Sequence, residues 1–78
     1  MHELKVFGMG CPKCATMYDN CLMALDEEGL QGIVIKVETL DAITRAGIMF
    51  TPALTIDGKV VSEGKILSVE QVRALLTR

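Results

Sequence analysis

The first half of the chain alternates between strand-like and helix-like patterns, and this alternation restricts the fold more than any other feature. Residues 3–7 alternate weakly between apolar and polar side chains, and residues 12–28 repeat apolar side chains at spacings of three and four. Residues 33–37 are almost continuously apolar and mostly β-branched, which is typical of a strand buried on both faces of a parallel sheet. Strand, helix and strand in so short a stretch predict a right-handed βαβ unit.

Local signals place the ends of the first helix. We expect Cys11 to be the N-cap and Pro12 to take the first helical position, where a missing N–H costs nothing. Gly29 and Gly32 are expected to stop the helix near residue 28. The apolar stripe expected to be buried consists of Ala15, Tyr18, Leu22 and Leu25.

The middle of the chain predicts a short helix followed by a β-hairpin. Thr39 can cap a helix that ends at Gly47. Two strand-like runs, 54–56 and 59–62, are separated by Asp57-Gly58, a strong signal for a type I′ turn. The middle of the chain therefore predicts a helix and then two antiparallel strands.

The last helix has the clearest end signals. Ser68 is expected to be its N-cap, and Gln71 three residues later completes a capping box. Leu67 and Val72 occupy the two positions of a hydrophobic staple. The stripe expected to be buried is Val69, Val72, Leu75 and Leu76. The whole chain is thus predicted to run β-α-β-α-β-β-α, an α/β fold.

Size and charge restrict the class of protein. The chain has 78 residues, half of them apolar, which is enough for one small core, so we expect a single domain over residues 1–78. A net charge of -2 without a basic run argues against nucleic-acid binding. No signal peptide or membrane-spanning run is recognisable, so we expect a cytoplasmic protein. We also expect it to be a monomer. Structural disulfides are rare in the cytoplasm, and close cysteines there are more often catalytic or metal-binding.

Two cysteines in the stretch Cys11-Pro12-Lys13-Cys14 lie where the first strand should pass into the helix. Unpaired N–H groups and the helix dipole favour a thiolate at Cys11, and Lys13 adds a nearby positive charge. Cys14 lies one turn further in, where it can close back on Cys11. The spacing suits a pair in which Cys11 attacks a disulfide and Cys14 resolves the mixed disulfide. A C-x-x-C motif alone is also compatible with a structural or metal-binding role.

Cys21 is the third thiol. It follows Cys14 by seven residues on the same helix, so the two Cα atoms should be ~10 Å apart. A disulfide requires Cα atoms within ~7 Å, so the two cannot pair in an intact helix. We expect Cys21 to be a small core residue. An auxiliary thiol or an intermolecular contact is the alternative.

Thr51-Pro52 comes directly before a strand-like run and has two interpretations. Proline lacks the N–H that a sheet requires, so Pro52 can simply mark the entry of an edge strand. Alternatively, a cis Thr51-Pro52 bond turns the backbone toward the cysteines, where it can pair with a bound partner segment. In this second interpretation, the proline also keeps metal ions away from the thiolates.

Taken together, these motifs resemble the thioredoxin superfamily, and within it the small prokaryotic thioredoxin-like redox-active disulfide proteins of glutaredoxin size. The resemblance covers nearly the whole chain and depends on the glycine-rich approach to Cys11, on residues 46–65 and on the last helix. It implies a thioredoxin-like fold with a four-stranded mixed sheet and three helices. It also implies that Cys11 and Cys14 are the redox pair, without a separate cofactor, and that Pro52 is the cis-proline. We expect the partner to contact Pro12, Lys13, Thr51 and Pro52.

Two departures from the superfamily pattern concern proton transfer and the electron donor. Thioredoxins carry a buried acidic residue beneath the cysteines, whereas the strand over residues 4–7 offers only Lys5 as a charged side chain. Glutaredoxins bind glutathione partly through a Gly-Gly-(Ser/Cys)-Asp stretch, whereas residues 60–67 read VVSEGKIL. We therefore expect a protein dithiol as the reductant, such as a thioredoxin-reductase-like donor, and not glutathione.

A metal-binding module is the main alternative. Residues 8–14, GMGCPKC, also resemble the Gly-Met-x-Cys-x-x-Cys loop of heavy-metal-associated domains, so the same cysteines could bind or deliver copper, zinc or another soft ion. Those domains end on a strand, whereas this chain ends on a capped helix and carries Thr51-Pro52 before a hairpin. The order of elements argues against a metal site, and we expect no metal.

A third interpretation is a partner-binding module without redox turnover. Gly8, Met9, Met49 and Phe50 could form an apolar rim around the cysteines. Met49 and Phe50 could equally belong to the core, and the pattern does not distinguish these two possibilities.

Overall fold

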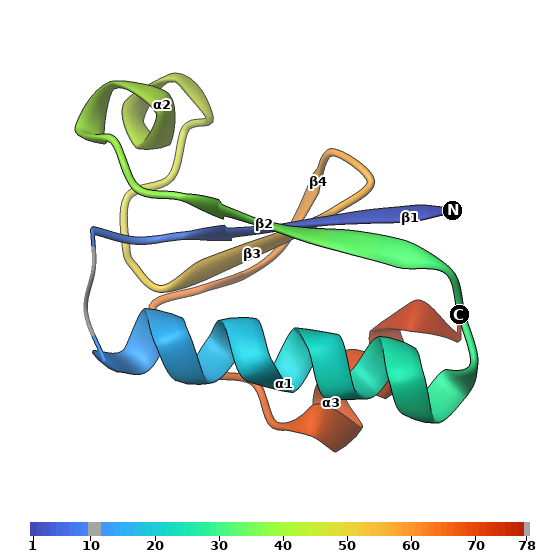
Figure 1. Cartoon of the computed structure of the whole chain (residues 1–78). Helices are drawn as coiled ribbons and strands as arrows, with labels where there is room; N and C mark the ends of the chain where they lie inside the picture. The colour runs from blue at the N-terminus through green and yellow to red at the C-terminus, as the bar shows by residue number, and fades with distance from the viewer. Residues whose placement is uncertain (10–11, 78) are drawn as a thin grey trace.

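The expected order of elements is present in the computed structural model, which describes residues 1–9 and 12–77. Figure 1 shows a single sheet with helices on both of its faces. The strands and helices are β1 (His2–Phe7), α1 (Pro12–Glu28), β2 (Gly32–Val37), α2 (Leu40–Arg45), β3 (Ala53–Ile56), β4 (Lys59–Glu63) and α3 (Val69–Leu76).

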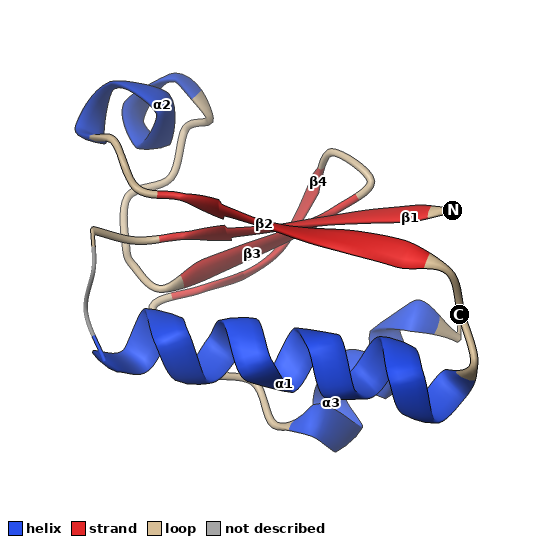
Figure 2. Ribbon diagram, in the orientation of Figure 1, coloured by secondary structure: helices blue, strands red, loops and turns tan. Residues whose placement is uncertain are grey.

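The four strands form a mixed sheet in the order β2-β1-β3-β4. β1 pairs in parallel with β2, as the βαβ prediction requires, and antiparallel with β3, which in turn pairs antiparallel with β4. Helices α1 and α3 lie side by side on one face of this sheet, and α2 lies on the other (Figure 2). The thioredoxin-like fold class expected from the sequence is confirmed.

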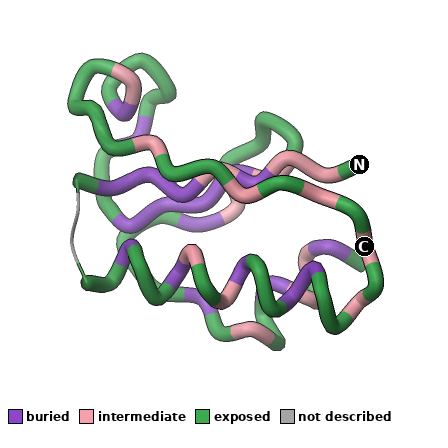
Figure 3. The backbone as a smooth tube through the Cα atoms, in the orientation of Figure 1, coloured by how far each residue is buried: buried purple, intermediate pink, exposed green. Residues whose placement is uncertain are grey.

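The main core lies between the sheet and the pair α1 and α3, and the buried residues follow this layer along the chain (Figure 3). The stripe predicted for α1 is wrong apart from Leu25: Ala15 and Leu22 are exposed and Tyr18 is half-buried. The helix instead buries Cys14, Met17, Cys21, Ala24 and Leu25. This face is mostly made of small or unbranched side chains, which allow α1 to approach both the sheet and α3 closely. The ring of Tyr18 is partly covered by the Lys36 ammonium, 4.7 Å from its centroid.

β2 is not buried on both faces, so that expectation is also wrong. It is an edge strand, and the side chains of Ile33 and Ile35 are 41% and 37% exposed. The reason is the shortness of α2, which stands over only one end of the second face (Figure 1). A second small core forms there from Phe7, Ile43, Ile48 and Ala53, with Val37 packed against it.

The hairpin between β3 and β4 has the predicted turn. Asp57 and Gly58 have φ angles of 52° and 85°, and both central residues of a type I′ turn require positive values. Asparagine, aspartate and glycine tolerate this region best, which is why two residues sufficed to predict the turn.

The last helix begins as predicted. The Ser68 hydroxyl accepts a hydrogen bond from the Gln71 N–H, and the Gln71 side chain accepts one from the Ser68 N–H. Leu67 and Val72 are both buried, as a hydrophobic staple requires. Arg73 further joins α3 to α1 through ion pairs with Glu27 and Glu28.

The carboxylate of Asp57 also ties the hairpin to the beginning of β1, and this makes stability depend on pH. It accepts hydrogen bonds from the Glu3 N–H at 2.8 Å and from His2 Nδ1 at 2.9 Å. The backbone hydrogen bond, followed by the His2 bond, lowers the pKa of Asp57. The pKa of Asp57 is therefore lower in the folded protein than in the unfolded chain. At pH values above the unfolded-state pKa, the ionised carboxylate contributes its full stabilisation. This contribution is lost as the pH falls through the folded-state pKa.

We therefore expect the Asp57→Asn variant to lose less stability than the unmodified protein does when the pH falls below about 4. Asparagine keeps the turn, since Asn-Gly also favours type I′. Urea unfolding measured between neutral and acidic pH would test this, with Asp19→Asn on the exposed side of α1 as the control. A variant with the same acid dependence as the unmodified protein would contradict the assignment.

Candidate active site

The site is built where β1 ends and α1 begins. Gly8 follows β1 directly, is buried, and donates its N–H to the Val37 carbonyl at 3.0 Å. Cys14 lies in the first turn of α1 and is only 7% exposed. A Cβ added to Gly8 would overlap the Cys14 Sγ, so this sulfur lies directly against the backbone of Gly8. The expectation that Cys14 is turned inward from the helix start is confirmed.

Cys11, the expected nucleophile and N-cap, lies outside the described residues. The helix nevertheless begins at Pro12, as predicted. Pro12 and Lys13, both expected to contact a partner, are exposed on its first turn.

The segment before β3 comes close to the same point. The Thr51-Pro52 peptide bond is cis. Thr51 is exposed, and its Cβ lies 3.9 Å from the position that a Cβ on Gly8 would occupy. Pro52 is fully buried, and its carbonyl accepts a hydrogen bond from the Gly64 N–H at 2.9 Å. Of the residues expected to contact a partner, Pro12, Lys13 and Thr51 thus have exposed surface, and Pro52 lies beneath.

Apolar side chains are exposed on the two segments that reach the site. Met9 follows Gly8, and Met49 and Phe50 precede Thr51; all three are more than half exposed. The possibility that Met49 and Phe50 belong to the core is therefore wrong. Phe50 lies against Gly64, with its Cβ 3.3 Å from where a Cβ on that glycine would be. Together, Met9, Met49 and Phe50 form what we call the apolar rim.

Cys21 is placed as the helix geometry predicted. It carries a free thiol, is fully buried in the main core, and lies two turns along α1 from Cys14. Burial raises the pKa of its thiol to about 12. A thiol is a poor nucleophile until it ionises, so Cys21 is chemically inert at neutral pH.

The surroundings of Cys14 contain no carboxylate from β1, because the two β1 residues that face α1 are Leu4 and Val6, both fully buried. A buried polar atom of this face is the Ser62 hydroxyl on β4, which has no hydrogen-bond partner among the described residues. Over residues 1–9 and 12–77, no group of three or more His, Cys, Asp or Glu side chains is placed to hold a metal ion.

Sequence patterns alone did not reveal that Gly8 contacts Cys14. They predict only that it ends the first strand and contributes to a rim, whereas the structure puts it in contact with the Cys14 sulfur. The usable signal is a glycine three residues before a C-x-x-C motif, at the end of a strand.

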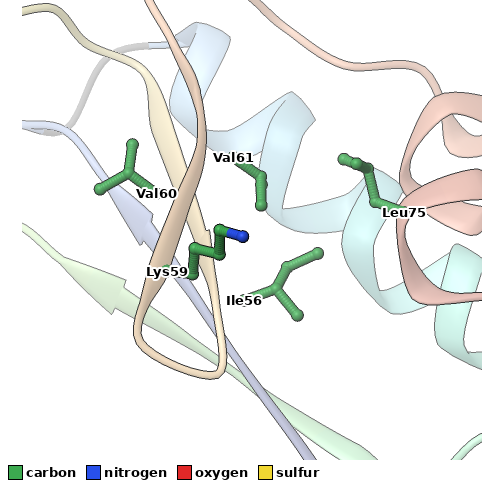
Figure 4. Close-up of a pocket in the computed structure, with 5 residues that line it drawn as sticks. All are labelled: Ile56, Lys59, Val60, Val61 and Leu75. Carbon is green, nitrogen blue, oxygen red and sulfur yellow. The ribbon is translucent and has the colours of Figure 1, made fainter. Parts of the chain in front are cut away.

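A separate hollow of about 360 Å³ lies between the β3–β4 hairpin and α3 (Figure 4). Its lining residues are Ile56, Lys59, Val60, Val61 and Leu75. Ile56 pairs with Leu4 near the beginning of β1, at the opposite end of that strand from Gly8. None of the expected site residues that the structure describes lines this hollow. No described helix is both long and apolar enough to cross a membrane.

Comparison with known proteins matches nearly the whole chain. A family model described as a thioredoxin domain matches residues 2–77. A protein named thioredoxin from Methanocaldococcus jannaschii is 37% identical over 73 residues, which cover 94% of this chain and 84% of the relative. Another protein named thioredoxin, from Methanothermobacter thermautotrophicus, is 29% identical over 77 residues, which cover 99% of this chain and all of the relative.

Proposed function

The chain belongs to the thioredoxin domain family, and from that premise we propose that it exchanges disulfides with protein partners through Cys11 and Cys14. Family membership supports a thiol–disulfide oxidoreductase. The assignment to these two cysteines depends on one observation: the Cys14 sulfur is buried at the start of α1, against the backbone of Gly8 and close to Thr51.

In the proposed reaction, the Cys11 thiolate attacks one sulfur of a partner disulfide and the other partner sulfur leaves as a thiolate. Cys14 then loses its proton and attacks Cys11 in the mixed disulfide, which releases the second partner thiolate. Two electrons pass to the partner, and the chain keeps a Cys11–Cys14 disulfide. The redox group is this disulfide itself, without a further cofactor.

The two thiols require different surroundings for these roles. Cys11 directly precedes Pro12 in the sequence, the residue at which α1 begins, and the unpaired N–H groups of a helix start favour a thiolate at that position. Cys14 is 7% exposed, so it cannot easily meet a large disulfide from solvent, yet it follows Cys11 by only three residues in the sequence. This asymmetry suits one attacking and one resolving cysteine.

The apolar rim is suited to the docking of a protein partner. Met9, Met49 and Phe50 present uncharged, adaptable surface on the two segments that reach the site. The exposed Thr51 next to them offers backbone groups with which an extended partner segment could pair. We propose a protein dithiol as the electron donor, because residues 60–67 lack the glutathione-binding stretch of glutaredoxins.

Thiol counting under controlled redox conditions tests the proposal. The protein is equilibrated with dithiothreitol or its oxidised form, quenched in denaturant with an alkylating reagent, and weighed by mass spectrometry. Since the chain has three cysteines, we expect three alkylated thiols after reduction and one after oxidation, with Cys21 as the constant one. The reduced protein should also reduce a disulfide-linked protein such as insulin. A difference other than two thiols, or no reduction of insulin, would overturn the proposal.

A further inference from the structure

We propose that Gly8 is a positioning residue for disulfide exchange, because its missing side chain provides the space in which the Cys14 sulfur sits. The inference rests on the proposed function and adds a requirement to it. It states that the resolving step depends on a residue outside the C-x-x-C motif and three positions before it.

The contact geometry is the first argument. A Cβ on Gly8 would overlap the Cys14 Sγ and would lie 3.2 Å from the Cys14 Cβ. The same Cβ would come within 3.9 Å of the Thr51 Cβ. The sulfur therefore packs against the backbone at the end of β1, in the space that a side chain at position 8 would occupy, and only glycine leaves this space open.

The backbone on both sides is held in place, which is the second argument. Gly8 donates its N–H to Val37, and the preceding Phe7 is paired with Val37 on one side and Ala53 on the other. Cys14 belongs to a 17-residue helix whose next two turns are fully buried at Met17 and Cys21. Neither backbone can retreat without disturbing the sheet or the main core, so a larger residue at position 8 has to displace the sulfur.

A displaced sulfur has a direct chemical consequence. The resolving attack requires the Cys14 sulfur to approach Cys11 in line with the disulfide that breaks, and misplacement by about 1 Å can slow such a step on the order of a hundredfold. The displaced thiol should also leave the buried space against Gly8 and become more accessible to reagents in solvent.

The test compares Gly8→Ala with Gly32→Ala. Gly32 is also crowded, since an added Cβ would lie 2.9 Å from the His2 carbonyl oxygen and 3.0 Å from a Leu25 methyl carbon, at the opposite end of the sheet. Both variants should lose stability, but only Gly8→Ala should slow resolution of the mixed disulfide in single-turnover experiments, by on the order of a hundredfold. In a Cys11→Ser background, Gly8→Ala should speed alkylation of Cys14.

A double-mutant cycle keeps the inference testable if Gly8→Ala folds poorly. Combined with Cys14→Ala, which removes the sulfur, Gly8→Ala should recover most of the lost stability; if the double variant is as unstable as Gly8→Ala alone, the inference is overturned. It is also overturned if Gly8→Ala resolves mixed disulfides as fast as Gly32→Ala does. If the unmodified protein forms no mixed disulfide at all, the proposed function itself fails, which is a distinguishable result.

Discussion

Replacing Cys14 by serine is expected to stop turnover after the first exchange and to leave the protein covalently joined to its partner. Cys11 still attacks the partner disulfide, but a serine hydroxyl cannot displace a thiolate from the resulting mixed disulfide. Replacing Cys11 by serine removes the attacking group, so reduction should fall by at least about three orders of magnitude, as for other essential nucleophiles.

Non-reducing electrophoresis and mass spectrometry distinguish these results. Cys14→Ser should accumulate an adduct with the mass of protein plus partner, which dithiothreitol releases, and Cys11→Ser should form none. Cys21→Ala is the control and should keep turnover, since the Cys21 thiol is fully buried and its pKa is raised to about 12. Multiple turnovers by Cys14→Ser at the unmodified rate would refute the resolving role.

Leu54→Ala is expected to destabilise the protein by about 2–5 kcal/mol. Leu54 is fully buried on β3, an inner strand, where it pairs with Val6 on β1 and Ser62 on β4. Its side chain belongs to the main core between the sheet and the helices, so truncation leaves a cavity that neighbours cannot fill. For a domain of this size each 1 kcal/mol lowers Tm by roughly 4–8 °C, so the expected loss is large.

Leu40→Ala is the matched control, because Leu40 lies on α2 with 65% of its side chain exposed. It should change stability by no more than about 0.5 kcal/mol. Thermal unfolding of both variants in the same redox buffer measures the difference. A cost for Leu54→Ala as small as that for Leu40→Ala would contradict the placement of Leu54 in the main core.

The destabilisation caused by Leu54→Ala should extend to the candidate active site, because β3 begins directly after Pro52. Pro52 is buried, and its carbonyl accepts a hydrogen bond from the Gly64 N–H. The position of Thr51 therefore depends on the attachment of β3 to the sheet. A destabilised β3 should open this segment more often than the rest of the fold.

Short-range signals predicted many features to within a residue. The turn at Asp57-Gly58 and the capping box of α3 each depend on residues a few positions apart, and both are present. The separation of Cys21 from Cys14 could be anticipated for a similar reason, since seven residues on a helix determine the distance between their Cα atoms.

The spacing of apolar residues was less informative where it fitted two structural arrangements equally well. On α1, apolar side chains occur on two faces, and the one containing Tyr18 and Leu22 was predicted instead of the one containing Met17 and Cys21. The run of β-branched residues in β2 is typical of a strand buried on both faces, but Ile33 and Ile35 are 41% and 37% exposed.

Chemistry between neighbours along the chain is thus enough for the hairpin turn and for the caps at the starts of α2 and α3, because their hydrogen bonds close within a few residues. The order of elements follows from the local spacing of apolar residues. Tertiary packing alone decided which face of α1 is buried, that β2 is an open edge, and that the Cys14 sulfur lies against Gly8. Those outcomes depend on contacts between segments that become neighbours only once the sheet has assembled.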